Sequence, residues 1–307
     1  MKKHHICVLG GTGFLGQALV HALATEGHEI VVPSRRPERC RELSLYPNVS
    51  MRQANIHLPE VLDELFKNVD TVINLVDSKK CSGSAFDQVH AELTRKVVKA
   101  CENNAVTRLL QWSAVSTDHT APYFASKLEA EKIALSSDRV NTTVLKTSWL
   151  FGEGTFGVKG DFLSEIQNRL KLPVAPFSQL QSRAAPIYFL DVVEIFKQTI
   201  DNPNTFNQSL TLCGTQSYTL KELVEWVKEI TESKTMIREV CSPMRSLMNV
   251  FARDVIQFFK VDSICEHNDV ELFDIELKDL KVQAASYLSP IAIRERYHEM
   301  RKESGRS

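Results

Sequence analysis

The stretch Gly10-Gly11-Thr12-Gly13-Phe14-Leu15-Gly16 decides the fold of this 307-residue chain. It follows a short apolar run at residues 6–9 and opens a helical pattern over residues 14–26. In such a strand-turn-helix unit the first glycine permits a tight turn, the second lets the backbone approach a pyrophosphate, and the third allows close packing of the helix on the strand. Free N–H groups and the positive end of the helix dipole would hold the phosphates. The stretch therefore predicts a dinucleotide-binding turn of the Rossmann type.

The alternation of strand and helix continues through the first half of the chain. Short apolar, β-branched runs predict strands at residues 6–9, 29–32, 49–54, 71–75, 108–112 and 142–146. Helical periodicity predicts helices at residues 14–26, 58–66, 86–103 and 122–136. This order is typical of an α/β fold with a doubly wound parallel sheet. We expect residues 1–150 to form an NAD(P)-binding Rossmann domain.

The pattern changes after residue 150. Glycines and prolines interrupt it, namely Gly152, Gly154, Gly157, Gly160, Pro173 and Pro176. Short strand signals near residues 186–190 and 209–213 could return to the Rossmann part, and a helix is expected at residues 220–232. We expect residues 151–307 to form a small, mostly helical C-terminal cap that serves as a substrate region.

Composition excludes several kinds of partner. The chain is 43% hydrophobic and 24% charged, with a formal net charge of -1, so it has no long-range attraction for nucleic acid. It has no run of 18 apolar residues, and its N-terminus lacks the apolar stretch of a signal peptide. We expect a soluble or peripheral membrane protein without a transmembrane segment. It would lie in the cytoplasm, or on the matrix side of mitochondria in a eukaryote.

The cysteines are scattered singly, at Cys7, Cys40, Cys81, Cys101, Cys213, Cys241 and Cys265. They form no CxxC pair and no cluster with histidine, so the spacing predicts neither a metal site nor a disulfide framework. Such usage is typical of a reducing compartment.

The residues after the second predicted strand bear on the choice of dinucleotide. A site for NAD usually has an acid about 20 residues after the glycines, to bind the ribose 2′-hydroxyl. Here the strand runs into Pro33-Ser34-Arg35-Arg36, and the first acid is Glu38. Guanidinium groups can bind a 2′-phosphate through paired hydrogen bonds. Ser34, Arg35 and Arg36 therefore favour NADP(H) over NAD(H); the alternative is that both arginines are solvated surface residues.

Tyr123 and Lys127 stand one helical turn apart, at the start of the helix that follows the fifth predicted strand. A doubly wound sheet binds its ligands at the carboxyl ends of the strands. An ammonium beside a phenol can lower the pKa of the phenol, so that Tyr123 could act as a general acid. The alternative is a structural pairing of an aromatic ring with a lysine.

Further motifs stand at Trp112-Ser113-Ala114, at Asn55-Ile56 and at residues 145–152, 185–193 and 218–223. With the glycine turn and the Tyr-Lys pair, they resemble the extended and atypical short-chain dehydrogenase/reductases. Within that superfamily the chain is similar to the nucleotide-binding accessory subunit of respiratory complex I and its bacterial relatives. The likeness covers most of the chain and weakens after about residue 240.

The resemblance implies a set of site residues. Tyr123, Lys127 and Ser113 would be catalytic. The dinucleotide would contact Gly10, Thr12, Gly13, Phe14, Leu15, Gly16, Ser34, Arg35, Arg36, Asn55, Ile56, Leu75, Val76, Tyr123, Lys127, Thr147 and Ser148.

The chain departs from the superfamily at two positions. Active members usually carry a catalytic hydroxyl residue where this chain has Ala114, and Ser113 or Ser116 would have to substitute. Their frequent asparagine in the helix before the fifth strand corresponds to His90, which we expect to be a packed core residue. Both departures weigh against turnover without affecting cofactor binding.

Two other features have open interpretations. Residues 242–261 carry an apolar stripe with basic residues around it, which would suit a membrane surface or a partner protein, although packing within the cap is favoured. Arg183 could contact an anionic substrate or could be a structural surface residue.

Two function classes follow. In the first, the protein is an accessory or assembly module that holds NADP(H), as the resemblance to the complex I subunit implies. In the second, it is an NADP-dependent oxidoreductase or epimerase/dehydratase. Tyr123 would then be the acid/base residue, Lys127 would bind the nicotinamide ribose, and Ser113 would polarise a carbonyl.

Overall fold

The computed structural model describes residues 2–77, 85–155, 161–239 and 261–290. Its centre is a parallel sheet of seven strands in the order β11-β6-β5-β4-β1-β2-β3. The predicted α/β doubly wound fold is therefore confirmed. The strands are β1 (His5–Leu9), β2 (Glu29–Ser34), β3 (Val49–Gln53), β4 (Thr71–Asn74), β5 (Arg108–Ala114), β6 (Asn141–Thr147) and β11 (Gln208–Leu212).

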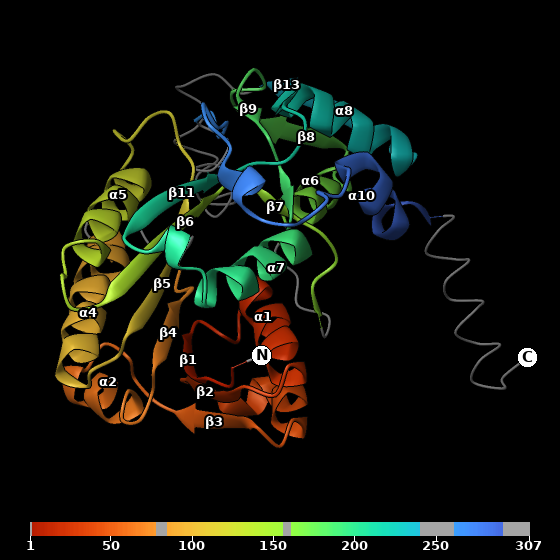
Figure 1. Cartoon of the computed structure of the whole chain (residues 1–307). Helices are drawn as coiled ribbons and strands as arrows, with labels where there is room; N and C mark the ends of the chain where they lie inside the picture. Colours follow the sequence, from red (N-terminus) through yellow and green to blue (C-terminus); the bar gives the residue numbers. More distant parts are fainter. Residues whose placement is uncertain (1, 78–84, 156–160, 240–260, 291–307) are drawn as a thin grey trace, which may run out of the picture.

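Helices cover both faces of this sheet (Figure 1). One face carries α2 (Pro59–Leu65), α4 (Leu93–Asn103) and α5 (Pro122–Ala134), and the other carries α1 (Phe14–Thr25) and α7 (Phe189–Ile200). Shorter helical turns join them, namely η1 (Pro37–Leu45), α3 (Ala85–Asp87), the π-helical turn η2 (Gln88–Glu92) and η4 (Pro203–Thr205).

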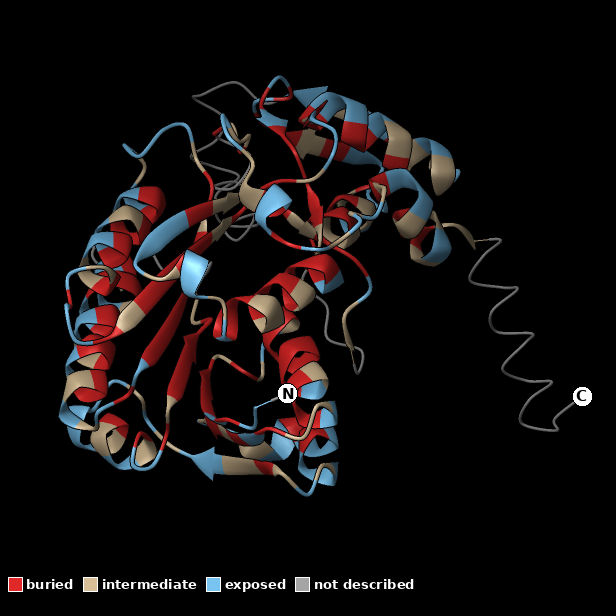
Figure 2. Cartoon of the chain, in the orientation of Figure 1, coloured by how far each residue is buried: buried red, intermediate tan, exposed pale blue. Residues whose placement is uncertain are grey.

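The sheet is buried between these two layers, as Figure 2 shows by the uniform burial of its central strands. On the α1 and α7 face, apolar side chains such as Leu19, Leu23 and Phe196 are fully buried. On the other face, Leu62 and Val97 are equally buried. Continuous apolar runs in the strands reflect this two-sided burial, which is why the strands are recognisable in the sequence.

The part of the chain that follows β6 is divided between the sheet and a cap. The segment near residues 209–213 forms β11, which pairs with β6 at the edge of the sheet. The segment near residues 186–190 forms β10, which pairs with β7 outside that sheet. The cap holds β7 (Leu150–Phe151), β8 (Val174–Phe177), β9 (Arg183–Ala184), β10 (Ile187–Tyr188), β12 (Tyr218–Thr219), β13 (Met236–Glu239), α6 (Phe162–Arg169), α8 (Leu220–Ile230), η6 (Asp269–Leu272) and α10 (Leu280–Leu288).

The cap is partly helical, and short strands accompany its helices. Its strands pair two by two, as β7 with β10, β9 with β12 and β8 with β13. Strands of two to four residues are too short to show an alternating pattern in the sequence. The helix expected at residues 220–232 is present as α8, which begins at a capping box between Thr219 and Glu222.

One prediction about the cysteines is wrong. Cys213 and Cys265 form a disulfide, although they are 52 residues apart in the sequence. Their spacing gives no local signal, because the chain must first place β11 beside the segment at residues 261–268. Cys7, Cys40 and Cys101 are free and buried.

Within the described ranges, no helix combines the length and apolarity needed to cross a membrane.

Candidate functional site

The site begins at the turn between β1 and α1. Gly10 has a positive φ of 78°, and a Cβ there would lie 2.9 Å from the carbonyl carbon of Leu75. A Cβ on Gly16 would lie 2.3 Å from the carbonyl oxygen of Gly10, so this position also requires glycine. Helix α1 has no side-chain cap at Gly13, and its first N–H groups are therefore available to an anionic ligand. The geometry fits a pyrophosphate cradle.

This turn lies where the strand order reverses, between β1 and β4. A doubly wound sheet has its crevice at that position. A cleft of about 1390 Å³ opens here and extends from the end of β2, past the glycine turn, to helix α6 of the cap. Most of the predicted cofactor-binding residues line it, namely Gly10, Thr12, Gly13, Phe14, Leu15, Gly16, Ser34, Arg35, Arg36, Asn55, Ile56, Leu75, Val76, Tyr123, Thr147 and Ser148.

One end of the cleft is basic. Arg35 and Arg36 are exposed there, and the Oγ of Ser34 accepts a hydrogen bond from the backbone N–H of Arg36 at 3.2 Å. Sequence reasoning missed Arg39 and His57, which also line this end. Partial burial lowers the pKa of His57, and the charges of Lys96 and Arg35 lower it further. Among the described residues that line the cleft, no acid lies at this end.

Tyr123 and Lys127 both contact one carboxylate. Tyr123 is 2% exposed, and its hydroxyl donates to Oδ2 of Asp77 at 3.1 Å. The Nζ of Lys127 lies 3.4 Å from Oδ1 of Asp77 and 5.0 Å from the ring centre of Trp112. Asp77 follows β4 and lines the cleft, whereas Lys127 lies behind the lining residues. The residues that immediately follow Asp77 fall outside the described ranges.

The surroundings of Tyr123 act on its pKa in the direction opposite to that predicted. Burial raises the pKa of the Tyr123 hydroxyl, and the negative charge and hydrogen bond of Asp77 raise it further. The expectation that Lys127 lowers this pKa is therefore wrong in this structure. Lys127 forms its ion pair with Asp77, and the negative charge of that carboxylate disfavours the phenolate form of Tyr123.

His90 completes the same network. It is 3% exposed; its Nε2 lies 3.0 Å from Oδ1 of Asp77, and its Nδ1 lies 2.8 Å from the hydroxyl of Ser126. Burial lowers the pKa of His90, as does the charge of Lys127. The hydroxyl of Ser126 donates to the backbone oxygen of Tyr123 at 2.8 Å, so the ring of His90 connects this turn of α5 with Asp77. His90 is thus a core residue, but a hydrogen-bonded one that fixes Asp77.

The other end of the cleft is built by the cap. It is lined by residues of α6 and by Asp161, which caps that helix by accepting from the N–H of Ser164. Asp161 also accepts a hydrogen bond from the hydroxyl of Tyr287 at 2.7 Å. Burial raises the pKa of this carboxyl group. Phe162, Glu165 and Asn168 give the same end a mixed apolar and polar lining.

A model of the NAD dependent epimerase/dehydratase family matches residues 6–212, from β1 to the end of β11. The chain belongs to this family. Membership implies that the protein binds a dinucleotide, and it confirms the resemblance to extended and atypical short-chain reductases.

Two mitochondrial proteins are among the similar sequences. The 40 kDa subunit of NADH-ubiquinone oxidoreductase from Neurospora crassa is 24% identical over 257 residues, which are 80% of this chain and 66% of that subunit. NADH dehydrogenase (ubiquinone) 1 alpha subcomplex subunit 9 from Dictyostelium discoideum is 23% identical over 291 residues, or 90% and 79% of the two chains. The predicted relation to the complex I subunit is therefore supported over most of the chain.

A solved structure shares the fold. The Bordetella bronchiseptica enzyme WbmH in complex with NAD+ has a TM-score of 0.73 and 18% identity, over 96% of this chain and 99% of that chain. The arrangement of sheet and cap is thus shared with that enzyme.

Ser113 and Ser116, the two candidates for the catalytic hydroxyl, form hydrogen bonds with other residues of the protein. The hydroxyl of Ser113 is buried and donates to Oε1 of Glu131 at 2.6 Å, and Ser113 is not among the cleft-lining residues. Ala114 lines the cleft in its place. The hydroxyl of Ser116 donates to the backbone oxygen of Asp118 at 2.7 Å. Alternation along β5 explains this placement, because neighbouring side chains point to opposite faces of a sheet.

The two remaining candidates from the sequence are Arg183 and the apolar stripe at residues 242–261. Arg183 donates to the hydroxyl of Ser217 at 2.9 Å and does not line the cleft. Residues 242–260 of the apolar stripe lie outside the described residues, and Val261 is buried against Phe86, Tyr123 and Phe124. Asp77 is the main residue that sequence reasoning missed, and its only signal is its place after β4.

Proposed function

We propose that this protein holds NADP(H) as a resident ligand and serves as an accessory or assembly module, without using the nucleotide for turnover. The observation that carries the proposal is the contact of Asp77 with both Tyr123 and Lys127. A general acid must release its proton in the reaction, which is most efficient when its pKa lies near the working pH. A buried phenol that donates to a carboxylate is unsuited to that role.

The end of β5 supports the same proposal. A carbonyl substrate needs a hydrogen-bond donor at its oxygen, and such a donor contributes substantially to the rate of acyl and carbonyl chemistry. Ala114 offers none from its side chain, and the hydroxyl of Ser113 is engaged with Glu131. Among the described residues that line the cleft, this supports binding over turnover.

The basic end of the cleft supports NADP(H) in preference to NAD(H). Arg35, Arg36 and Arg39 line this end together with His57. With no acid among the described residues at this end, three guanidinium groups would attract a 2′-phosphate, whose charge an aspartate or glutamate would repel.

The sequence relatives support a role in assembly. The Neurospora crassa and Dictyostelium discoideum proteins are named as subunits of the respiratory NADH dehydrogenase. By analogy, this chain would attach to a larger protein complex, either in the cytoplasm or on the matrix side of mitochondria, as a soluble or peripheral component. Residues 242–261 are our candidate contact with a partner protein or a membrane surface.

The experiment that tests this proposal analyses the nucleotide that co-purifies with the protein. We expect NADP(H) in near one-to-one amount, and calorimetric titration of the emptied protein should give tighter binding for NADPH than for NADH. Equal affinity for the two would remove the NADP(H) assignment. Bound NADPH should stay reduced during incubation with a panel of aldehydes and ketones.

One observation favours a second function. The cleft continues beyond the dinucleotide turn to Asp161 and α6, which leaves room for a second ligand. If nucleotide binding moves Asp77 away from Tyr123, the protein could act as an NADP-dependent oxidoreductase or epimerase/dehydratase, with Tyr123 and Lys127 in the usual roles. Oxidation of bound NADPH by a carbonyl compound, lost in Tyr123→Phe, would favour this function.

A further inference from the structure

The disulfide lies directly behind a wall of the cleft. Cys213 follows β11 and is 2% exposed, whereas Cys265 is half-buried. The pair packs in a small apolar cluster with Val115 and Ala185. Val115 lines the cleft at the end of β5, so the disulfide is one residue layer away from the ligand space.

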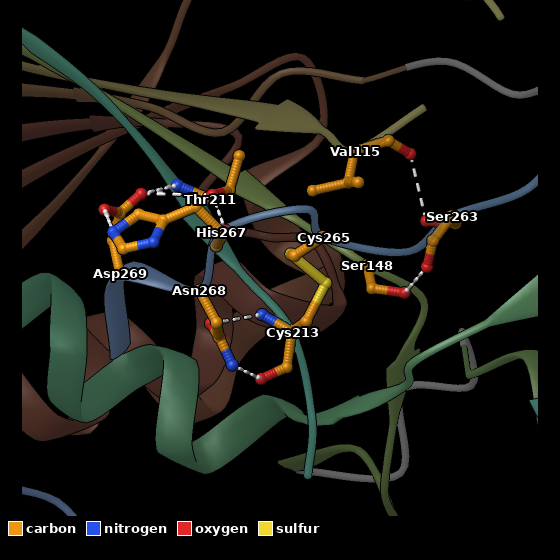
Figure 3. Close-up of a disulfide and its surroundings, with 9 residues drawn as sticks. All are labelled: Val115, Ser148, Thr211, Cys213, Ser263, Cys265, His267, Asn268 and Asp269. Carbon is orange, nitrogen blue, oxygen red and sulfur yellow. Dashed lines mark hydrogen bonds and ion pairs between the residues drawn. A yellow bond between two sulfur atoms is a disulfide. The ribbon is translucent and has the colours of Figure 1, made fainter. Parts of the chain in front are cut away.

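The segment that carries Cys265 is itself part of that wall. We call residues 261–269 the strap. Figure 3 shows Ser263 of the strap between Val115 and Ser148. The hydroxyl of Ser263 donates to the backbone oxygen of Val115 at 2.9 Å, and its backbone oxygen accepts from the hydroxyl of Ser148 at 2.7 Å. Val115, Ser148 and Ser263 all line the cleft. The position of the strap therefore affects the ligand space directly.

Beyond Cys265, the strap is fastened to β11 and to Cys213. The side chain of Asn268 accepts from the N–H of Cys213 at 3.1 Å and donates to its backbone oxygen at 3.0 Å. Asp269 accepts from the N–H of Thr211 at 2.7 Å. The disulfide stands between these contacts and those of Ser263. It is a covalent tie at the middle of a segment that is otherwise held by hydrogen bonds.

We infer that Cys213–Cys265 is a thiol–disulfide exchange site whose redox state controls how tightly the cleft holds its dinucleotide. The co-reactant is a dithiol. Two features carry the inference: one sulfur belongs to a half-buried residue, and the disulfide packs against Val115, which lines the ligand space. Cysteine pairs that react in this way are the usual disulfides of reducing compartments.

The exchange balances in two steps. A thiolate of the dithiol attacks the sulfur of Cys265, the less buried partner, and forms a mixed disulfide there. The electron pair of the broken S–S bond goes to the sulfur of Cys213, which takes up a proton in its apolar surroundings. The second thiol of the reagent then attacks the reagent's own sulfur, and Cys265 leaves and is protonated. The dithiol ends as a disulfide, having supplied two electrons and two protons.

Reduction has a defined consequence for the cleft. The strap loses its covalent tie but keeps the hydrogen bonds of Asn268 and the backbone bonds of Ser263 to Arg183 and Ala185, so the fold remains. Val115 loses the fixed disulfide against which it packs, and the wall of the cleft at Val115 becomes less ordered. A ligand that needs the ordered wall must restore it on binding, which lowers its affinity.

The test uses the full-length chain and dithiothreitol as the dithiol. Free thiols are counted by maleimide labelling and mass measurement before and after treatment, and circular dichroism checks the fold. Calorimetric titration then uses NADPH or NADH, whichever binds the oxidised protein more tightly. We expect dithiothreitol to expose two more thiols without denaturant and to weaken binding about tenfold, a change of about 1.4 kcal/mol. Reoxidation should restore the affinity.

The double variant Cys213→Ser/Cys265→Ser is the matched control. It should bind like the reduced protein and should not respond to dithiothreitol. If it does not fold, the reduced and reoxidised wild-type protein still decides the question. Equal affinity in the two redox states would overturn the inference, as would a disulfide that resists dithiothreitol until the protein is unfolded. A response of the double variant to the reagent would contradict it as well.

Discussion

The hydroxyl of Tyr123 donates a hydrogen bond to Oδ2 of Asp77 at 3.1 Å. This contact engages the candidate acid/base residue of the cleft. Asp77 also receives Lys127 and His90, so the residues expected to drive proton transfer converge on one carboxylate. The glycine turn and the arginines stand apart from this network. The cleft can therefore bind a dinucleotide while its acid/base pair is engaged.

Replacing Asp77 with asparagine should lower the pKa of Tyr123. The carboxylate disfavours the phenolate through its charge, and asparagine keeps the shape without that charge. Burial remains, so the pKa should stay above that of a free phenol. An ultraviolet titration of tyrosine ionisation, with Tyr123→Phe subtracted to isolate the signal, would measure the shift. An unchanged titration would show that the charge of Asp77 does not act on Tyr123.

His90 should make the stability of the protein depend on pH. Its pKa is lowered in the folded state, so the unfolded chain binds a proton more readily. The contribution of neutral His90 to the free energy of unfolding is fully present above the pKa of the unfolded chain, about 6.5. It decreases as the pH falls below that value toward the lower pKa of the folded state. Urea unfolding of wild type and His90→Asn between about pH 5 and pH 8 would compare the slopes. We expect the free energy of unfolding of His90→Asn to fall less steeply with decreasing pH than that of the wild type. Parallel curves for the two proteins would contradict this role of His90.

Arg35 and Arg36 should discriminate between the two dinucleotides. A hydrogen bond to a charged group contributes about 1.5–3 kcal/mol, so removing both guanidinium groups should weaken NADPH binding about 10- to 100-fold or more. NADH binding should change little. Arg41 lies in the turn η1 that follows Arg36 but does not line the cleft, so Arg41→Ala is the matched control. Similar losses for NADPH and NADH in the Arg35→Ala/Arg36→Ala variant would argue against a 2′-phosphate site.

The glycine turn should tolerate substitution unequally. A Cβ at Gly16 would meet the oxygen of Gly10 at 2.3 Å, whereas a Cβ at Gly13 would meet it at 3.2 Å. Gly16→Ala should therefore displace the turn from α1 and lower the melting temperature as well as abolish binding. Gly13→Ala should keep most of the stability and lose affinity. Thermal unfolding with calorimetric titration separates the two effects, and equal stability of both variants would contradict the packing argument.

The sequence was informative where local patterns determine structure. The turn at Gly10–Gly16 and the buried strands around it are recognisable because both faces of the sheet are covered, and β11 had a visible strand signal. The basic end of the cleft, with Arg35 and Arg36, followed from the same reasoning. The position of the Tyr-Lys pair after the fifth strand indicated the carboxyl end of the sheet, where Tyr123 lines the cleft and Lys127 lies behind it.

The features that were missed depend on contacts between distant segments. Asp77 meets Tyr123 across 46 residues, and Cys213 meets Cys265 across 52. Neither separation carries a local signal, because the tertiary fold alone brings the partners together. Ser113 was assigned to the site by its place at the end of β5, but the alternation of the strand turns its side chain toward Glu131. The two-residue strands of the cap were also too short to predict.

We propose that the cleft holds NADP(H) while Asp77 keeps Tyr123 from acting as an acid. The most direct test loads the protein with one equivalent of NADPH and follows the absorbance of the reduced nicotinamide during incubation with a panel of aldehydes and ketones. We expect the bound NADPH of the wild type to be oxidised no faster than the bound NADPH of Tyr123→Phe. Oxidation by a carbonyl compound in the wild type, but not in Tyr123→Phe, would contradict it.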